Sequence, residues 1–436
     1  MTDHSPSDSR EVVIVDGVRT PFIRSAGAYA GWLPHELAAR PLQMLAERLI
    51  ARDVDAAAVD AVAMGSTVHE TNTPNVAREA MLAAGYAPTT PAWTTSMAGL
   101  SPNLAITTVA DAIYAGRAEF GVAGGVETFS EAPIRLSRGI RRAAMVVRMA
   151  RTRGDTLRGL VALRPRDLAL DLPRSGDITT DMTMGEATER MAGPFGVTRA
   201  DADAWAMGSH TRAVEAWTAG RYDDQVALVA DSPGGPVRRD NGPRSDTSPA
   251  KLAALAPAFR ADGLITAGNA SGFTDGAAAI ALASRTAAET RGLPVRAVLR
   301  GVRFVGVPDL HDEHLIGPAL AIPGLLDAHG LTLADVDVVE LHEAFASQVL
   351  AVLSALASNT FARTHLNRTS AVGEVDPARV NAWGGSIALG NPFSATGARL
   401  LLTAVDRLQA EDGRWAIVSS CAGGGLGVAM LLERQS

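Results

Sequence analysis

The only cysteine of the 436-residue chain stands where a thiol could do chemistry. Cys421 follows 415–420, an apolar stretch typical of a buried strand, and precedes the glycines 423–425. Glycines let backbone N–H groups converge on one point, because no Cβ stands in the way. The thiol could therefore act as acid, base or nucleophile beside an anion-binding nest. The alternative is a small buried cysteine beside a tight turn, and this stretch alone leaves both interpretations open.

The elements that must position this tip alternate as expected for an α/β protein. Residues 426–432 predict the return strand of a hairpin, with the glycines at its tip. Further strands are expected at 11–16, 59–64 and 336–341, and helices at 33–51, 75–84, 104–115, 343–356 and 398–410. Residues 384–389 are expected to run into a loop at 390–392.

Two stretches of the chain follow the same order of helix, Gly-Arg, strand and paired glycines. The first ends at Gly124-Gly125 and the second at Gly423-Gly424, which predicts a duplicated α/β unit. The repeat places Gly99 and Asn391 in corresponding loops, each just ahead of a helix. A helix N-terminus stabilises a thiolate or an oxyanion, so chemistry is expected at both loops.

Composition narrows the class of protein. A chain of 436 residues exceeds one ordinary hydrophobic core, so two domains or a duplicated architecture are expected. The hydrophobic fraction of 47% and charged fraction of 20% are those of a soluble globular protein. The net charge of −7 argues against nucleic-acid binding, and no metal site is predicted. A polar N-terminus without an apolar signal region predicts a cytoplasmic protein.

Residues 135–166 have a different character from the rest of the chain. They carry ten arginines and a single acid, Asp155, with apolar residues interleaved. Two basic amphipathic helices broken near Gly154 would fit this pattern. One interpretation is a solvated excursion packed on its parent domain. The other is a surface for an anionic membrane or a partner subunit.

Motifs spread from residue 12 to 433 resemble those of the thiolase family, in particular its fatty-acid-oxidation branch of trifunctional-enzyme β-subunit type. They are 16–22 (DGVRTPF), 123–127 (AGGVE), 240–244 (DNGPR), 268–276 (GNASGFTDG), 342–345 (HEAF), 384–390 (GGSIALG) and 421–425 (CAGGG), together with the arginine-rich insertion. The resemblance implies a duplicated, five-layered αβαβα fold with an inserted loop domain. It also implies a CoA thioester as substrate or ligand, and no resident cofactor.

The resemblance further implies domain bounds and partners. Residues 1–130 would begin the N-terminal half, 131–262 form the loop domain, 263–290 complete the N-terminal half and 291–436 form the C-terminal half. A homo-oligomer is expected, as is an α-subunit carrying hydratase and dehydrogenase activities. Peripheral membrane contact through residues 135–166 would be compatible with a cytoplasmic protein.

Two residues depart from the family pattern where the family does its chemistry. Aligned without a gap, the nucleophilic cysteine of the family falls on Gly99, and a family glycine falls within one position of Pro102, which is expected to distort the loop. The family motif Gly-His-Pro reads Gly390-Asn391-Pro392 here. A glycine has no side chain, and an amide cannot act as a general base at neutral pH. The resemblance leaves Cys421 as the proton donor and acceptor at the substrate α-carbon.

The remaining candidate residues support binding of an acyl-CoA more directly than transfer of its acyl group. His342 matches the position that holds a water for the oxyanion hole, although it could instead cap a helix that starts at Glu343. Glu343 would orient His342 or favour that helix start. The resemblance places Ser271 at the pantetheine arm of CoA and the Gly423 backbone in an oxyanion hole.

The sequence therefore favours a thiolase-family acyl-CoA protein that binds CoA thioesters without the acyl-cysteine step. Three alternatives remain. The first is an active acyltransferase with Cys421 as nucleophile. The second is a retro-aldol or proton-transfer enzyme that uses Cys421 and the oxyanion hole on acyl-CoA. The third is a non-catalytic subunit.

Overall fold

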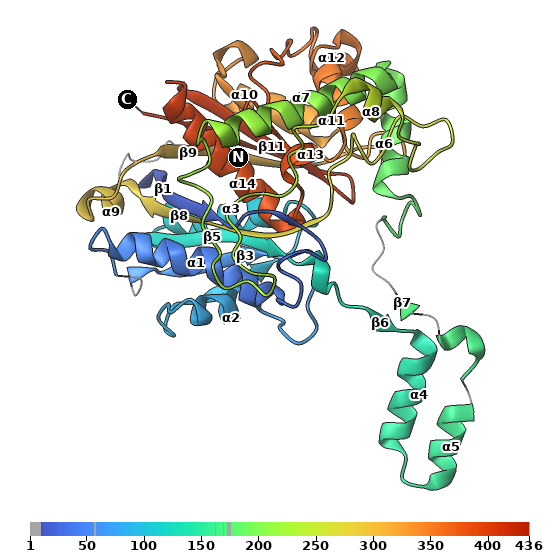
Figure 1. Cartoon of the computed structure of the whole chain (residues 1–436). Coiled ribbons are helices and arrows are strands. Elements are labelled where there is room, and N and C mark those ends of the chain that lie inside the picture. Colours follow the sequence, from blue (N-terminus) through green and yellow to red (C-terminus); the bar gives the residue numbers. More distant parts are fainter. Residues whose placement is uncertain (1–9, 56–57, 162, 169, 172–175, 436) are drawn as a thin grey trace.

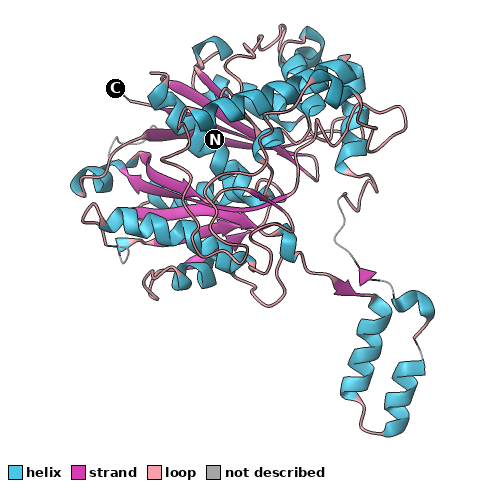
Figure 2. Ribbon diagram, viewed as in Figure 1, coloured by secondary structure: helices cyan, strands magenta, loops and turns pink. Residues whose placement is uncertain are grey.

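The computed structural model describes residues 10–55, 58–161, 163–168, 170–171 and 176–435. Its main strands follow one path, in the order β10-β11-β12-β9-β1-β8-β5-β3-β4. The path narrows where β1 (Val12–Arg19) meets β9 (Ala297–Gly306), because these strands share only two register pairs. The narrowing separates two groups of strands, one from each half of the chain (Figure 2).

The two groups of strands are built alike. The N-terminal group adds to β1 the strands β3 (Ala61–Gly65), β4 (Ala92–Thr95), β5 (Phe120–Glu127) and β8 (Thr274–Ser284), with β2 (Ile23–Arg24) paired to β8. The C-terminal group adds to β9 the strands β10 (Val338–Leu341), β11 (Trp415–Ala422) and β12 (Leu426–Glu433). In each group a parallel pair, β3–β5 or β10–β11, is followed by an antiparallel neighbour.

Helices complete five layers (Figure 1). The outer N-terminal layer holds α1 (Pro34–Ile50) and α2 (Val76–Ala83), and the central layer holds α3 (Ser101–Tyr114) and α14 (Phe393–Ala410). The outer C-terminal layer holds α10 (Gly317–Ala328), α11 (Ala346–Leu356) and α12 (Asn359–His365). Two short helices lie in the connections between larger elements: α9 (Arg285–Thr290) between β8 and β9, and α13 (Ser386–Leu389) between α12 and α14. The expected αβαβα fold is confirmed.

Alternation along the strands explains why each sheet can be covered on both faces. In β1, Val13 and Val15 pack in the cluster that contains α1 and α2, whereas Ile14 packs in the central cluster. Successive side chains of a strand point to opposite faces, so a continuous apolar run buries itself only between two helical layers. Each fully buried Val or Ile side chain contributes about 1.5–3 kcal/mol.

The predicted repeat of helix, Gly-Arg and strand is present in both halves, as α3–β5 and α14–β11. The paired glycines are not equivalent, however. Gly124 and Gly125 lie inside β5, where an added Cβ would stand only 1.9 Å from the Ala278 carbonyl oxygen and 1.7 Å from that of Ser394. Gly423 and Gly424 instead form the turn after β11. The first pair therefore serves close packing, and only the second lies at a tip.

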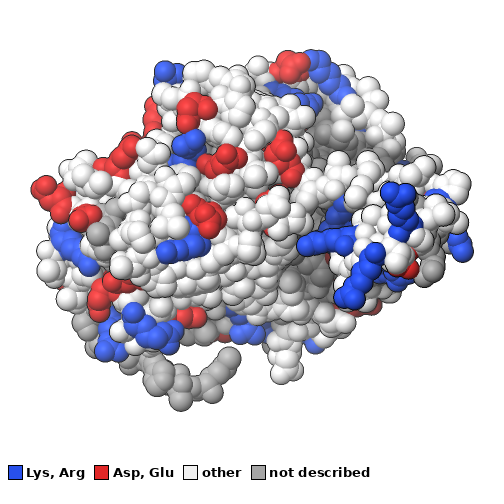
Figure 3. Space-filling view, turned by 90° about the horizontal axis from the view of Figure 1, so that it is seen from below, with Lys and Arg blue, Asp and Glu red and all other residues white. Residues whose placement is uncertain are grey.

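The loop region contributes β6 (Arg135–Leu136), α4 (Arg138–Met149), α5 (Arg153–Val161), β7 (Leu170–Asp171), α6 (Met184–Ala192), α7 (Arg199–Thr218) and α8 (Pro249–Ala253). Helices α4 and α5 form a hairpin that projects from the body (Figure 1). Lys and Arg side chains gather on it, whereas both signs of charge are interspersed over the body (Figure 3). The two predicted helices are present, with a break at 150–152. No helix in the described part of the chain is long and apolar enough to cross a membrane.

A buried ion pair holds the loop region on the N-terminal half. Asp240 accepts two hydrogen bonds from the Arg19 guanidinium, at 2.7 and 2.8 Å, and both side chains are fully buried. The Asp240 carboxylate also accepts the Phe22 N–H at 2.6 Å. The Asp-Asn-Gly segment at 240–242 is thus a structural strap between the two parts.

Two helix boundaries differ from the sequence prediction in ways that matter for the site. Helix α3 begins at Ser101 rather than at 104, and α11 begins at Ala346 rather than at Glu343. A third difference is α13, because 386–389 form a short helix that the sequence did not predict. The first turn of a helix lacks internal hydrogen-bond partners, so apolar periodicity alone locates it poorly.

Candidate functional site

The loop that carries Gly99 contacts the hairpin that carries Cys421. A Cβ added to Gly99 would lie 3.6 Å from the Ala422 Cβ and 3.9 Å from the Cys421 carbonyl oxygen, which are ordinary contacts. The Gly99 backbone does not adopt a positive φ, whereas the preceding Ala98 does, at 46°. The position would therefore accept a larger side chain without backbone strain.

The start of α3 is held without help from residue 99. Ser101 Oγ accepts the Met97 N–H at 2.8 Å and donates to the Ala98 carbonyl at 2.6 Å. Pro102 occupies the second position of α3, where a backbone N–H has no intrahelical partner to lose. The expectation that Pro102 distorts this loop is wrong, because the helix starts earlier than the apolar pattern indicated.

Asn391 occupies the corresponding place ahead of α14, and its amide is bound at both ends. Its Oδ1 accepts a hydrogen bond from Thr396 Oγ1 at 2.9 Å, and its Nδ2 donates to Ser271 Oγ at 3.2 Å. Its main-chain N–H donates to the Gly272 carbonyl at 3.1 Å. The structure thus brings together two predicted residues, Asn391 and Ser271, that lie 120 positions apart in the chain.

His342 is buried and neutral. Burial, followed in importance by the nearby Arg399 guanidinium, lowers the pKa of His342 to about 3. Its Nδ1 lies 2.9 Å from Ser386 Oγ, which already accepts a hydrogen bond from Arg399 at 2.7 Å. The Ser386 hydroxyl proton is free to be donated to Nδ1, and in that arrangement the neutral imidazole carries its own proton on Nε2. The side chain therefore offers an N–H and no charge.

The helix-cap interpretation of His342 and Glu343 is wrong, because α11 begins at Ala346. Glu343 is instead fully buried and accepts four hydrogen bonds. The donors are Trp205 Nε1 at 3.0 Å, Ser209 Oγ at 2.8 Å, Asn381 Nδ2 at 2.8 Å and the Ile387 N–H at 3.2 Å. Glu343 thus fixes the segment after β10 to α7 and α13, with His342 beside it.

Cys421 lies near the end of β11, opposite Gly427 of β12, so the predicted hairpin is confirmed. Its side chain is 3% exposed and packs in the outer C-terminal cluster with Leu315, Met191 and Ile417. Burial raises the pKa of the Cys421 thiol to about 12. A thiol of this kind is a protonated group at neutral pH and a poor nucleophile.

The turn that follows Cys421 exposes backbone donors. Gly424 and Gly425 have φ values of 82° and 68°, which only glycine adopts readily. The Gly424 N–H donates to Asp177 Oδ2 at 2.7 Å, whereas the N–H groups of Gly423 and Gly99 donate to no acceptor among the described residues. The oxyanion-binding role of the Gly423 backbone stays a prediction, and it would use such a donor.

The sequence pattern missed two residues at this turn, Asp177 and His314. The Asp177 Oδ1 lies 3.3 Å from the position of a Cβ added to Gly423, and the Met184 sulfur lies 3.4 Å from it. His314 Nε2 lies 2.9 Å from Asp177 Oδ2. Asp177 stands 247 residues before Gly424, and no motif in the sequence links them.

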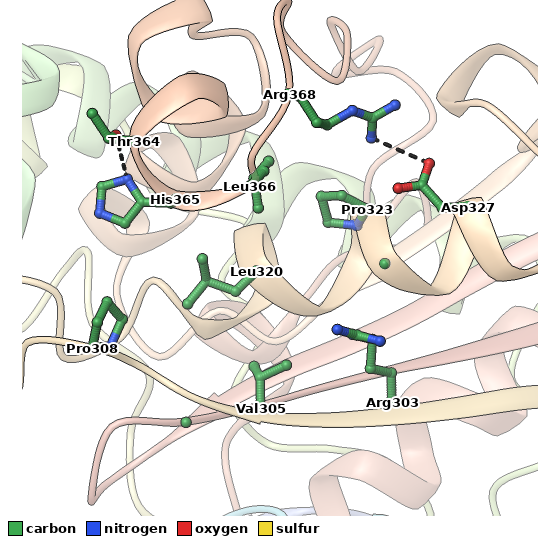
Figure 4. Close-up of a pocket in the computed structure, with 12 residues that line it drawn as sticks. Arg303, Val305, Pro308, Leu320, Pro323, Asp327, Thr364, His365, Leu366 and Arg368 are labelled. Atoms are coloured by element: carbon green, nitrogen blue, oxygen red, sulfur yellow. Dashed lines mark hydrogen bonds and ion pairs between the residues drawn. The ribbon is translucent and has the colours of Figure 1, made fainter. Parts of the chain in front are cut away.

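A cavity of about 540 Å³ lies elsewhere, between β9, α10 and α12 (Figure 4). Arg303, Asp327, His365 and Arg368 line it, together with apolar side chains that include Val305 and Leu320. None of the predicted site residues lines this cavity. No cluster of three His, Cys, Asp or Glu side chains suited to a metal ion is present in the part of the chain that the structure describes.

The chain belongs to the thiolase family. Residues 12–286 match the thiolase N-terminal domain and residues 293–434 match the thiolase C-terminal domain.

Among its relatives, the mitochondrial trifunctional enzyme subunit beta of Bos taurus is 40% identical over 97% of this chain and 88% of the relative. A 3-ketoacyl-CoA thiolase of Yersinia pestis (strain Pestoides F) is 39% identical over 97% of this chain and 96% of its own length. Two solved structures, each with a TM-score of 0.82, agree with this fold. The Bacillus anthracis acetyl-CoA acetyltransferase is 33% identical and covers 97% of this chain and 98% of its own, and the human mitochondrial 3-ketoacyl-CoA thiolase is 29% identical and covers 99% and 100%.

Proposed function

We propose that this thiolase-family protein binds an acyl-CoA at the meeting point of the Gly99, Asn391 and Cys421 segments without transferring the acyl group to a cysteine. The contact at Gly99 carries the proposal. The loop is placed against Cys421 and Ala422, with space for a side chain that residue 99 does not have. The second loop carries the Asn391 amide, which has no basic nitrogen and whose oxygen and nitrogen are both already hydrogen-bonded.

Cys421 is a poor substitute for the missing nucleophile. A thiol with a pKa near 12 has only about one molecule in 10⁵ ionised at pH 7. The same property suits a proton donor, as in the alternative of a retro-aldol or proton-transfer enzyme on acyl-CoA. Free N–H groups at Gly99 and Gly423 support binding of a thioester oxygen in either case.

Calorimetric titration with acetyl-CoA and hexanoyl-CoA tests the binding step. We expect saturable binding. We also expect Ser271→Ala to weaken it about three- to tenfold, as for the loss of one neutral hydrogen bond. Thr218→Ala is the matched control, because this hydroxyl is exposed on α7 and donates only to its own helix, at Val214. Absence of binding up to millimolar acyl-CoA would contradict the proposal.

We also propose that the α4–α5 hairpin contacts a partner. The relatives named trifunctional enzyme subunit beta suggest an α-subunit, and the arginines suggest peripheral contact of a cytoplasmic protein with an anionic membrane. Met145, Val146 and Met149 are 52, 46 and 74% exposed. A group of apolar side chains exposed to this extent is typical of a surface that contacts a partner. Each arginine near an anionic surface contributes on the order of 1 kcal/mol before screening.

Deletion of residues 135–166 should abolish co-purification with the α-subunit or co-sedimentation with anionic vesicles. Two smaller variants separate these outcomes. Replacing Arg138, Arg142 and Arg148 by Gln should release a membrane contact, whereas replacing the three apolar residues Met145, Val146 and Met149 by Ser should release a subunit. If the intact protein does neither, the hairpin is a solvated excursion.

A homo-oligomer is the remaining part of the proposal. Strand β4 stands at one end of the strand path, and its first three residues are only partly buried. An uncovered strand edge presents unpaired N–H and C=O groups that another copy can satisfy. Sedimentation velocity should give a mass at least twice that of one chain, and a monomer at micromolar concentration would contradict this.

A further inference from the structure

Asp177 and His314 form a pair beside the glycine turn that follows Cys421. The His314 side chain is fully buried, and the Asp177 side chain is 23% exposed. His314 Nε2 lies 2.9 Å from Asp177 Oδ2 but forms no hydrogen bond with any described residue. A buried ring nitrogen without a hydrogen bond is costly, and functional groups are one reason that proteins retain such atoms.

The contacts of His314 show which of its two ring nitrogens carries a proton and which one faces the Asp177 carboxylate. Nδ1 lies 2.8 Å from the Leu310 carbonyl, which can only accept, so Nδ1 carries a proton. Nε2 is then the nitrogen that faces Asp177. The imidazole thus lies against the Oδ2 side of the carboxylate.

The two carboxylate oxygens of Asp177 have different partners. Oδ2 accepts the Gly424 N–H at 2.7 Å and faces His314. Oδ1 has no hydrogen-bond donor among the described residues and lies 3.3 Å from the Cβ position of Gly423. The free oxygen is therefore directed over the residue whose N–H is also free.

Cys421 lies on the same side of this turn. Its side chain packs in the outer C-terminal cluster, where Met184 also packs, and the Met184 sulfur lies beside Asp177 Oδ1 at the Gly423 position. A carboxylate that can accept a proton and a thiol that can return one are thus placed around one free backbone donor. This is the set of groups that enolisation of a thioester needs.

From this arrangement we propose that Asp177 is the catalytic base that removes a proton from the α-carbon of a bound acyl-CoA, with His314 as its positioning residue. Asp177 Oδ1 takes the proton, and the C–H electron pair forms the double bond of the enolate. The carbonyl π pair moves to the thioester oxygen, which accepts the Gly423 N–H. A proton then returns to the α-carbon from Asp177 or from the Cys421 thiol, so no oxidant or acyl acceptor is needed. This inference rests on the proposed function.

Exchange of the α-protons of hexanoyl-CoA in D₂O, followed by NMR on the full-length protein, tests the assignment. The unaltered protein should accelerate exchange over buffer. Asp177→Asn keeps an acceptor for Gly424 and should lower the exchange rate at least about 100-fold, with calorimetric binding of hexanoyl-CoA within threefold of the parent. His314→Gln should lower it about tenfold. Asp312→Asn is the control. This exposed carboxylate lies in the same loop as His314 and pairs only with Arg190, at 2.7 Å.

Three results would overturn the inference and leave the proposed binding function intact: binding by the parent without exchange, exchange by Asp177→Asn at the parent rate, or loss of both binding and exchange in Asp177→Asn, which would make Asp177 a clamp. If Asp177→Asn does not fold, an unchanged exchange rate in His314→Gln overturns it, and a tenfold loss with binding retained supports it. Failure of the parent to bind hexanoyl-CoA would remove the proposed function as well.

Discussion

The two halves of the molecule present the same loop-to-helix junction in two different states. Ahead of α3, Gly99 leaves open space beside Ala422 and the backbone donor is free. Ahead of α14, Asn391 fills its place and is tied to Thr396 and Ser271. The helix starts themselves are alike and buried, and Ser101 secures the first without residue 99. The frame of such a junction is therefore independent of its reactive side chain, so chemistry can be lost while the fold persists.

The loss of chemistry at the Gly99 junction would be compensated if Cys421 in the C-terminal half had become the nucleophile. Because its thiol has a pKa near 12, against about 8.5 for a free cysteine, alkylation by iodoacetamide at pH 8 should be roughly 1,000-fold slower than for N-acetylcysteine. The rate should rise about tenfold per pH unit up to pH 11, as the thiolate fraction grows. The reaction is read by mass spectrometry, without interference, since the chain has one cysteine. The guanidinium-unfolded protein is the control and should react at the ordinary rate.

Restoring the family side chains at both junctions at once tests whether these two positions alone account for the missing chemistry. Gly99→Cys introduces a thiol without a base and Asn391→His a base without a thiol, so each alone should be nearly silent. The double variant should gain at least about 100-fold in thiolysis of acetoacetyl-CoA, non-additively, because the two side chains act as one unit. Gly99→Ala combined with Asn391→His is the control and should remain inactive. Pro102 needs no change, since it fits the second position of α3.

The C-terminal junction also depends on the buried carboxylate of Glu343. In Glu343→Gln, an amide NH₂ would face donors where a carboxylate now accepts four hydrogen bonds. We expect a loss on the order of 3 kcal/mol in the free energy of unfolding, measured in urea. Glu374→Gln, at an exposed position, should change it by no more than about 0.5 kcal/mol. An equal effect of both substitutions would show that the network is not needed.

Acid should weaken the same region. The pKa of His342 is about 3 in the folded protein and about 6.5 in an unfolded chain, so between these values only the unfolded state binds the proton. Stability is therefore complete above pH 6.5 and falls by about 1.4 kcal/mol per pH unit as the pH drops toward 3. His342→Asn should remove this share of the slope, whereas exposed His311→Asn should not. The remaining slope includes a contribution from His210. Burial, followed in importance by the nearby Arg244 guanidinium, lowers the pKa of His210 to about 4.

Much of the frame of the site could be predicted from the sequence, because its elements are encoded locally. The apolar run and the glycines after Cys421 specify the hairpin, and the repeated helix and strand specify two equivalent junctions at Gly99 and Asn391. The helix starts near residues 101 and 346 could not be located from the sequence, because neither has a side-chain cap and apolar spacing does not mark the first turn of a helix.

The contacts that complete the site could not be predicted in this way. Asp177 and His314 are 137 residues apart in the chain, and each is an ordinary polar residue in its own segment. Glu343 is similar, because its partners Trp205 and Asn381 come from distant elements. Only the packing of the loop region on the C-terminal half brings such residues together. Their roles therefore become visible only in three dimensions.

The central claim is that the unaltered protein binds acyl-CoA and forms no acyl-cysteine. Incubation with acetoacetyl-CoA and free CoA, with the 3-ketoacyl-CoA absorbance followed over time and the intact protein mass measured, tests it most directly. We predict no cleavage above the buffer rate and no mass increase corresponding to an acetyl group. Cleavage at an ordinary thiolase rate, together with an acetyl adduct that Cys421→Ala removes, would contradict the account.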